Sequence, residues 1–343
     1  MSNDWYKVPR QTKINAYTQI SEETGMAPYA IEKDWWVVQV LSSIFELEVG
    51  NSLIFKGGTS LSKAWQLIDR FSEDIDLAID RNYLDFKGEL SRKQIKKLRR
   101  FTGEYIEEKL SQDLDARLIE NGLSDIKLHY LRQEASDADP AKIEILYPNV
   151  IEYPAYVEPR VLLEISCSSL MEPVEVRSFY SLLDEHYLES DFAEGPIDIS
   201  TAIPERTFLE KLFLLHEEFH RPQERIRVDR LSRHLYDVFQ LMKSDHAINA
   251  IDNQALYETI VKHRQAFYHM GGIDYNLHQP QTLNPIPIPE VMDAWEADYR
   301  TMQEEMIYGD SPTFKTMIAT IRAFTENILN QLDWKIDFLF PKP

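Results

Sequence analysis

The stretch Leu53-Ile-Phe-Lys-Gly-Gly-Thr-Ser-Leu-Ser-Lys63, followed by Arg70-Phe-Ser-Glu-Asp-Ile-Asp-Leu-Ala-Ile79, decides the fold that we expect for this chain of 343 residues. It predicts a short apolar strand, a tight turn, a helix and a second strand. The paired glycines permit close approach of the backbone, which side chains would block. Thr59 or Ser60 is suited to cap the helix, whose free N–H groups would then face a bound phosphate.

The second strand of this unit alternates acidic and apolar residues, beginning with Asp74 and Asp76. Residues two apart share one face of a strand, so both carboxylates point the same way. Two bare carboxylates repel each other, and a divalent cation removes that conflict. Oxygen ligands favour Mg²⁺ or Mn²⁺, and Mg²⁺ is typically held by one or two carboxylates together with substrate phosphates. The alternative interpretation is an ordinary surface strand after a structural turn.

Taken together, Gly57-Gly58-Thr59 and Arg70-x-Ser72-x-Asp74-Ile-Asp76 resemble the signature of the AbiEii/AbiGii nucleotidyltransferases. These enzymes are relatives of the MenT toxins within the DNA-polymerase-beta-like superfamily. Three other segments, Glu32-Lys-Asp-Trp-Trp36, Glu210-Lys211-Leu212 and Arg233-His-Leu-Tyr-Asp237, also resemble motifs of this family, so the resemblance covers about residues 30–240. It implies an α+β fold in which a mixed sheet flanked by helices is followed by an all-helical C-terminal domain.

The resemblance implies a Mg²⁺-dependent (or Mn²⁺-dependent) transfer of a nucleotide from an NTP to an acceptor hydroxyl. Asp74 and Asp76 would be metal ligands, and a third carboxylate would lie on a neighbouring strand. Glu164, in Val161-Leu-Leu-Glu-Ile165, fits the family pattern better than Glu144, which stays the alternative. Glu164 would help to hold a metal or act as the base.

The resemblance also assigns the residues that would bind the nucleotide. Lys211 would offset the charge of the triphosphate, and Asp237 would orient Lys211 or the nucleotide. Lys63 is a further candidate for the triphosphate, whereas Arg70 is a candidate for a structural role. The cradle for the leaving phosphates would consist of Gly57, Gly58, Thr59 and Ser60.

The family implies the toxin of a bacterial toxin–antitoxin or abortive-infection system. The expected acceptor is RNA, namely the 3′ end of tRNA, and the expected protein partner is a cognate antitoxin. The residues leave open which NTP is used and which oligomer forms. Two alternatives remain open, which are a protein acceptor and a catalytically inactive nucleotidyltransferase fold that serves as a binding module.

A remote alternative comes from His216-Glu217-Glu218-Phe219-His220, which matches the H-E-x-x-H pattern of zinc metalloproteases. Such helices usually carry uncharged residues at the two variable positions, and Glu218 departs from that rule. Pro222 follows almost at once, and no third ligand is evident beyond it. We therefore rank the zinc protease behind the nucleotidyltransferase.

Charge and composition limit the classes of function. A net charge of −20 argues against general affinity for nucleic acids, although Arg92–Arg100 is a dense basic run that is either a solvated helix face or a local contact for nucleic acid. No apolar run of about 20 residues is present, so we expect no membrane span. Cys167 is the only cysteine, and the polar N-terminus lacks a signal core. Both features favour the cytoplasm.

The pattern of the chain predicts a nucleotidyltransferase domain with N-terminal helices over residues 1–200 and a helical domain over residues 201–343. We expect three strands at about 126–132, 142–147 and 160–166, and a loop-rich connector at 173–200. Helical periodicity continues from Glu205 onward. The segment 269–276 is predicted to be a loop without an assigned role.

Overall fold

The computed structural model describes residues 4–72, 74–154 and 157–342, and the chain divides into two compact units. Unit 1 comprises Met1–Trp65 and Phe71–Ala202, and unit 2 comprises Gln66–Arg70 and Ile203–Pro343. The short stretch Gln66–Arg70 therefore belongs with the C-terminal helices, although the sequence pattern assigned it to the first domain.

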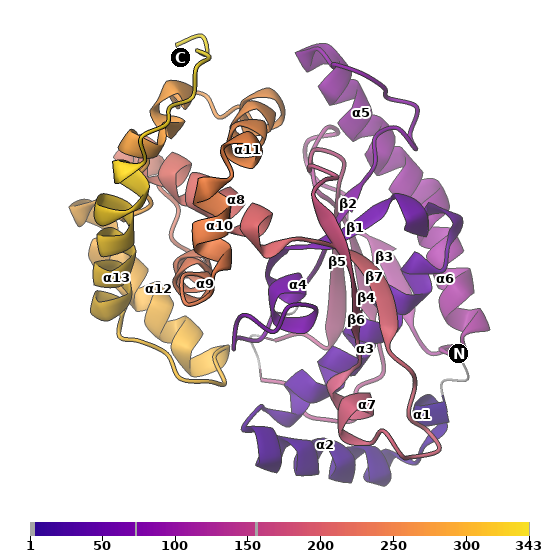
Figure 1. Ribbon diagram of the computed structural model, residues 1–343. Coiled ribbons are helices and arrows are strands. Elements are labelled where there is room, and N and C mark those ends of the chain that lie inside the picture. The colour runs from indigo at the N-terminus through magenta and orange to yellow at the C-terminus, as the bar shows by residue number, and fades with distance from the viewer. Residues whose placement is uncertain (1–3, 73, 155–156, 343) are drawn as a thin grey trace. The chain divides into compact units, whose positions relative to one another are not determined.

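Within its described residues, unit 1 contains a seven-stranded mixed sheet in the order β3-β4-β5-β2-β1-β7-β6 (Figure 1). At its centre, β2 runs antiparallel to β1 and parallel to β5. The strands are β1 (Leu53–Lys56), β2 (Asp74–Ile79), β3 (Lys127–Tyr130), β4 (Ala141–Leu146), β5 (Arg160–Ser166), β6 (Val174–Phe179) and β7 (Ile197–Ala202).

The inner strands form because their apolar residues alternate with polar ones. In β4 and β5 the buried residues occupy every second position, as the period of a strand requires. The same alternation in β2 buries Ile75 and Leu77 and leaves Asp74 and Asp76 half-buried on the other face. One face of the central sheet is therefore apolar, while the other carries charge.

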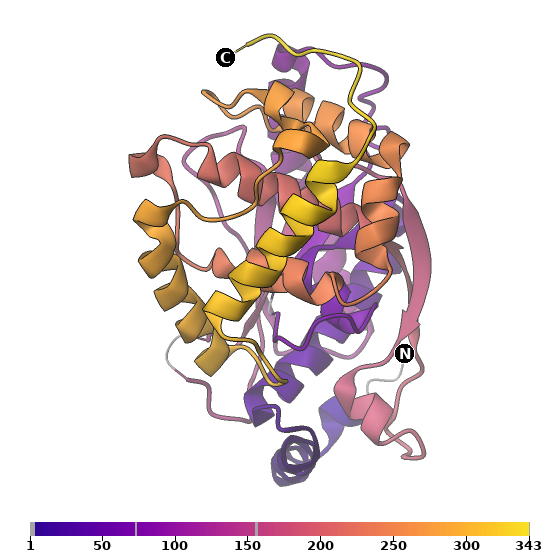
Figure 2. The same cartoon turned by 60° about the vertical axis from the view of Figure 1, so that its left-hand side comes forward.

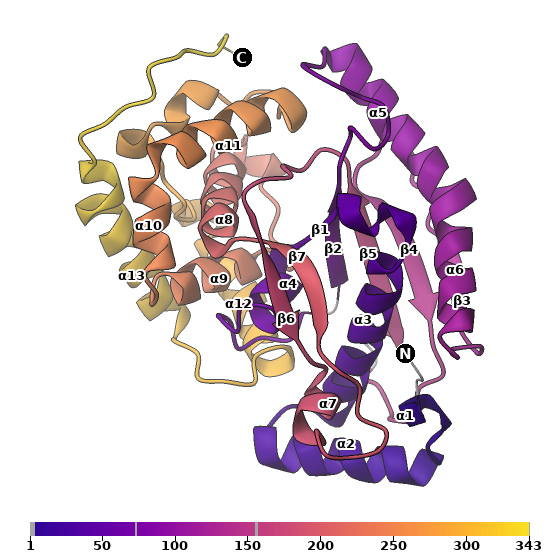
Figure 3. The same cartoon turned by 45° about the vertical axis from the view of Figure 1, so that its right-hand side comes forward.

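Helices cover the apolar face of the sheet. Helix α3 packs on β5 and β7 and against α6, and it is buried over most of its length (Figure 3). Helix α2 ends at Gly25, whose φ of +74° makes it the expected left-handed cap. The helices of unit 1 are α1 (Asp4–Lys7), α2 (Arg10–Thr24), α3 (Pro28–Phe45), η1 (Glu48–Ser52), α4 (Gly57–Lys63), α5 (Arg92–Tyr105), the π-helical turn η2 (Ile106–Leu110), α6 (Ser111–Glu120) and α7 (Leu182–His186).

Two local predictions for unit 1 are wrong. Helix α4 begins at Gly57, without a capping side chain, and ends at Lys63, so neither Thr59 nor Ser60 is its cap. The chain leaves the helix early because Gln66 adopts a left-handed φ of +53° at the start of the stretch that joins unit 2. The predicted connector at 173–200 contains β6, α7 and β7, and β7 pairs with β1.

In its described residues, the regular elements of unit 2 are helices, and α8 lies against α9, α10 and α11. Helix α13 packs on α9 and α12 (Figure 2). No helix in the described parts of the chain combines the length and the apolar character needed to cross a membrane. The longer helices are α8 (Pro204–Phe219), α9 (Ser232–Leu241), α10 (His246–Asp252), α11 (Gln254–Phe267), α12 (Met292–Glu305) and α13 (Phe314–Asn327), with 3₁₀ turns η3 (Gln223–Arg225), η4 (Tyr275–His278), η5 (Pro280–Thr282), η6 (Pro289–Val291) and η7 (Leu329–Gln331).

Candidate active site

Four charged side chains from four neighbouring strands lie in register across the centre of the sheet. Lys142 on β4 pairs with Glu164 on β5, Glu164 pairs with Asp76 on β2, and Asp76 pairs with Lys56 on β1. Residues in register on adjacent strands share a face of the sheet. We call this set of Lys142, Glu164, Asp76 and Lys56 the charged row.

The two carboxylates of the charged row are flanked by ammonium groups. The Lys142 Nζ lies 2.5 Å from Glu164 Oε1, and the Lys56 Nζ lies 3.9 Å from Asp76 Oδ1. Asp74 stands two residues before Asp76, on the same face of β2. The structure therefore brings together Asp74, Asp76 and Glu164, three carboxylates that the sequence pattern selected.

Glu144, the alternative third carboxylate, lies one strand further from β2. It stands opposite Leu162 in register, and its Oε1 accepts a hydrogen bond of 2.5 Å from the Arg160 guanidinium. Arg160 also pairs with Glu158. Glu164, and not Glu144, is thus the glutamate beside Asp76.

The turn after β1 brings backbone directly against the Asp76 side chain. Gly57 has a φ of +80°, and a Cβ atom there would lie 2.2 Å from Asp76 Oδ2. Both the backbone conformation and the lack of space require glycine at this position. Gly57 is therefore required both for the turn and for the close approach of the backbone to the Asp76 carboxylate.

The hydroxyl groups of the first turn of α4 are used inside unit 1. The Thr59 hydroxyl donates to the Asp74 carbonyl oxygen and lies 2.8 Å from Ser72 Oγ, which ties α4 to the start of β2. The Ser60 hydroxyl donates to the Gly57 carbonyl oxygen at 2.9 Å. Both side chains are buried. The groups that this turn offers to a ligand are therefore its backbone N–H groups, including that of Gly58.

Lys63, at the end of α4, is held by an acidic partner. Its ammonium lies 2.9 Å from Asp34 on α3, and Asp34 also accepts the backbone N–H of Leu182 at 2.6 Å. Lys63 therefore links α4 to the helices beneath it.

The carboxylates of Asp74 and Asp76 are suitable ligands for a hard divalent cation. Asp74 and Asp76 supply only oxygen atoms, which is the donor type that Mg²⁺ and Mn²⁺ favour. Across residues 4–72, 74–154 and 157–342, no set of three His, Cys, Asp or Glu side chains is already arranged around a common metal position. Glu164 is engaged by Lys142 instead.

Unit 2 contains a buried network around Asp237, on α9. The Arg70 guanidinium donates to both carboxylate oxygens of Asp237, at 2.7 and 2.8 Å, and the Lys211 Nζ lies 2.8 Å from Oδ2. The Lys211 Nζ also lies 3.4 Å from His234 Nδ1. Arg233 stands four residues before Asp237 on the same helix, but the arginine that pairs with Asp237 is Arg70.

Burial and charge act in opposite directions in this network. Burial alone raises the pKa of Asp237, yet Arg70 and Lys211 hold that pKa well below its ordinary value. Burial lowers the pKa of Lys211, and Asp237 opposes that shift. Burial and the Lys211 charge hold the pKa of His234 well below its ordinary value. Asp237 is therefore an anion that positions the Lys211 ammonium.

The H-E-x-x-H segment is not a zinc site. The Arg264 guanidinium donates to both oxygens of Glu217, at 2.7 and 2.5 Å, and His278 Nε2 lies 3.1 Å from Oε1. His216 Nδ1 accepts the backbone N–H of Asn284 at 3.0 Å. The glutamate that a metalloprotease needs as a base is thus locked in a buried ion pair, and the motif arises by chance.

Sequence reasoning missed Lys56 and Lys142 and left Arg70 as a structural candidate. Lys142 stands two residues before Glu144 on an alternating strand, so it was visible as a charge on that face. Its partner depends on the register between β4 and β5, which local sequence does not encode.

Comparison with known proteins supplies a family and a structural relative. The model of a family described as "Nucleotidyl transferase AbiEii toxin, Type IV TA system" matches residues 39–328. Among solved structures, the chain is similar to MenT4, a nucleotidyltransferase toxin from Mycobacterium tuberculosis H37Rv, with 16% identity and a TM-score of 0.46. That alignment covers 94% of this chain and 98% of the other. No curated protein matches the chain.

Proposed function

Because the chain belongs to the AbiEii family of nucleotidyltransferase toxins of type IV toxin–antitoxin systems, we propose that it transfers a nucleoside monophosphate from an NTP to the 3′-terminal hydroxyl of an RNA, with Mg²⁺ as cofactor. The expected acceptor is tRNA. The observation that carries the proposal is the position of Asp74, Asp76 and Glu164 on one face of adjacent strands, beside the turn at Gly57.

The proposed reaction is a displacement at phosphorus. The acceptor oxygen attacks the α-phosphorus, and the bond to the oxygen that bridges to the β-phosphate breaks. Pyrophosphate leaves with the electron pair, and the hydroxyl proton passes to Glu164. When bound, Mg²⁺ (or Mn²⁺) supplies charge neutralisation at the phosphates. Asp74 and Asp76 would hold it.

The turn at residues 57–60 and the lysines of the charged row have separate roles in this proposal. The backbone N–H groups of residues 57–60 would hold the leaving phosphates, as successive N–H groups in a turn do for anions. Lys63 would keep α4 in place through Asp34, close to those phosphates. Lys142 and Lys56 would limit the repulsion between the carboxylates before the substrate binds.

Lys211 and Asp237 form the second part of the proposed machinery. Lys211 would offset part of the charge of the triphosphate through its ammonium group. Asp237 would act as a positioning residue, because it holds the Lys211 ammonium at 2.8 Å while Arg70 fixes the carboxylate. A cognate antitoxin is the expected protein partner, since the family comprises toxins of toxin–antitoxin systems.

The test is transfer of label. Purified protein is incubated with Mg²⁺, each α-labelled NTP in turn, and total bacterial RNA plus cell lysate. We expect a labelled RNA band that Asp74→Asn/Asp76→Asn abolishes. The variant Glu144→Gln is the matched control, because it removes a carboxylate from the same sheet outside the charged row.

Other outcomes decide between the alternatives. A labelled protein band instead of RNA would move the acceptor to a protein side chain. The absence of label in every lane, with folded protein and every NTP tested, would contradict the proposed reaction and favour the inactive binding module.

A further inference from the structure

The basic run of the sequence forms one exposed face of α5. The capping box of Ser91 and Gln94 starts the helix, and Ile95 and Leu98 hold its buried side against unit 1. Lys93, Lys96, Lys97 and Arg100 are exposed, and their spacing of three and four residues puts them on one side of the helix. We call these four residues the basic face.

The basic face borders a hollow of about 450 Å³. Its four cations line the hollow together with Gln94, Ser136 and Asp137. Across the described parts of the chain, Lys93, Lys96 and Lys97 form no ion pair, and Arg100 reaches Glu104 only at 3.9 Å. Positive charge is thus concentrated in a concave surface of a protein whose net charge is −20.

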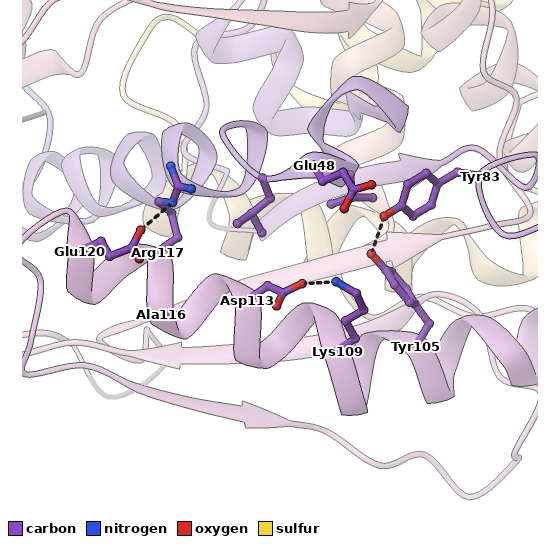
Figure 4. A pocket seen from close by; sticks show the side chains of 10 residues that line it. Glu48, Tyr83, Tyr105, Lys109, Asp113, Ala116, Arg117 and Glu120 are labelled. Atoms are coloured by element: carbon purple, nitrogen blue, oxygen red, sulfur yellow. Dashed lines mark hydrogen bonds and ion pairs between the residues drawn. The ribbon is translucent and has the colours of Figure 1, made fainter.

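The helical segments η2 and α6, which follow α5 directly, show how such cations are used when their role is structural. A second hollow of about 340 Å³ there is also lined by cations, but Lys109 faces Asp113 and Arg117 faces Glu120 (Figure 4). Those charges are compensated within the helix. The lysines of the basic face have no such compensation, which points to a negatively charged ligand from outside.

Aromatic rings lie beside the basic face. Phe101 is 42% exposed, and its ring centroid is 5.8 Å from that of the half-buried Phe86. The Lys97 ammonium lies 6.0 Å from the Phe86 ring centroid. Cations that follow a backbone and rings on which bases stack are the combination that binds single-stranded nucleic acid. An acidic protein segment would pair with the cations but would not explain the exposed aromatic ring beside them.

The basic face is anchored to the strand that carries Glu164. Arg99 donates to Ser168 Oγ at 3.0 Å, and Asp139, two residues after Asp137, accepts from Ser166 Oγ at 2.7 Å and from the Cys167 N–H at 3.1 Å. Ser168 is four positions after Glu164, so the two residues are at most about 14 Å apart along the chain. A strand of RNA on the basic face therefore lies a few nucleotides from the charged row.

We propose that the basic face of α5, together with Phe101, binds the sugar–phosphate backbone and bases of a single-stranded RNA segment. The inference rests on the proposed function, because it supplies the acceptor strand for the same site. Lys93 and Arg100 are seven residues apart, so the face spans about 10 Å of helix. That length accommodates a few successive phosphates.

The test measures binding of RNA without NTP, so that it does not depend on transfer. A fluorescent oligouridine is titrated with the full-length protein, with Lys93→Gln/Lys96→Gln/Lys97→Gln/Arg100→Gln, and with the control Lys315→Gln/Arg322→Gln/Lys335→Gln/Lys342→Gln, which removes four exposed cations from unit 2. We expect the affinity to fall at least about tenfold in the first variant only. The slope of log K against log salt should flatten by about 3, since each phosphate contact on a single strand contributes about 0.7.

Phe101→Ala separates stacking from charge. It should weaken binding about fivefold while leaving the salt slope unchanged, because an aromatic ring displaces no counterions.

The proposal would be overturned if the variant of the basic face and the control had equal affinity and equal salt slope. It would also be overturned if the unaltered protein had no measurable affinity for oligouridine. Loss of polyglutamate binding, with RNA binding retained, would assign the face to an acidic protein. Calorimetric titration should show that these variants bind NTP and Mg²⁺ as the unaltered protein does. If the proposed function is wrong, the unaltered protein itself should show no such binding.

Discussion

At the scale of single residues, the closest approach in the proposed site is that of Gly57 to Asp76. A Cβ atom at position 57 would lie 2.2 Å from the Asp76 carboxylate and would also strain the left-handed backbone. Gly57→Ala should therefore displace Asp76 and destabilise unit 1 by about 2 kcal/mol or more. Thermal unfolding and the transfer assay measure the two effects.

Gly88 offers a matched control for this substitution. Its φ is +72°, but nothing lies within 4 Å of the position that a Cβ would occupy. Gly88→Ala should cost only the conformational strain, about 1 kcal/mol. Equal losses in the two variants would show that the contact with Asp76 has no consequence.

Glu217 gives a second prediction at this scale, which concerns pH. Burial alone would raise the pKa of Glu217, but Arg264 and His278 bring it down from 4.5 to about 2. A depressed carboxylate pKa stabilises the fold above the pKa of the unfolded state, and this contribution is lost as the pH falls toward the folded value. The window runs from about pH 4.5 to about pH 2, and the stabilisation at stake is about 3 kcal/mol.

The measurement compares the unaltered protein with Glu217→Gln, which does not titrate at this position. The variant should be less stable at neutral pH, because it leaves Arg264 buried without a counterion. The difference in Tm should shrink as the pH is lowered through the window. A difference that stays constant from pH 5 to pH 2 would contradict the assigned coupling.

At the scale of elements, the register of β2 and β5 favours Glu164 as the third carboxylate of the proposed site. Glu164 stands beside Asp76, whereas Glu144 stands beside Leu162 and is held by Arg160. Glu164→Gln should lower the rate of nucleotidyl transfer about 10²-fold or more, as loss of a proton acceptor does. Glu144→Gln should leave the rate within about threefold, because Arg160 keeps Glu158 as a partner. If single-turnover assays instead showed a larger loss of rate for Glu144→Gln than for Glu164→Gln, the third carboxylate would be Glu144 on β4.

Much of the arrangement of elements was predictable, and the misses have physical causes. Alternation predicted β4 and β5 because one face of each strand is buried. It failed for β6, an edge strand in which polar residues and the exposed Val176 obscure the period. The caps at Thr59 and Ser60 failed because both hydroxyls satisfy carbonyl groups of the protein. The carboxylates of the candidate site were visible as acids on strands, but their lysine partners depend on register.

At the scale of the whole molecule, unit 2 is completed by five residues from the middle of unit 1. Arg70 lies 167 residues before its partner Asp237, and both side chains are buried. Arg233, four residues before Asp237 on α9, is the nearer arginine in the sequence, but it is not the partner. Long-range pairing of this kind leaves no local signal, since each partner is compatible with many others.

This pairing predicts a clear difference between two arginines. Arg70→Met leaves the Asp237 carboxylate with Lys211 as its remaining cation and should cost about 3–5 kcal/mol, as breaking a buried ion pair does. Arg233→Met removes a half-buried side chain outside that pair and should cost less than about 1 kcal/mol. Calorimetric unfolding of the two full-length variants measures both. Similar losses would contradict the assignment of Arg70.

The insertion of Gln66–Arg70 into unit 2 also limits how this protein can evolve by recombination. A single crossover near residue 202 would combine Arg70 from one parent protein with Asp237 and the C-terminal helices from another. The two residues would then come from sequences that had changed independently of each other. A productive exchange between distant relatives needs matched replacements on both sides of β2. We therefore expect the two halves to be exchanged together, and hybrid genes with a single junction to be rare.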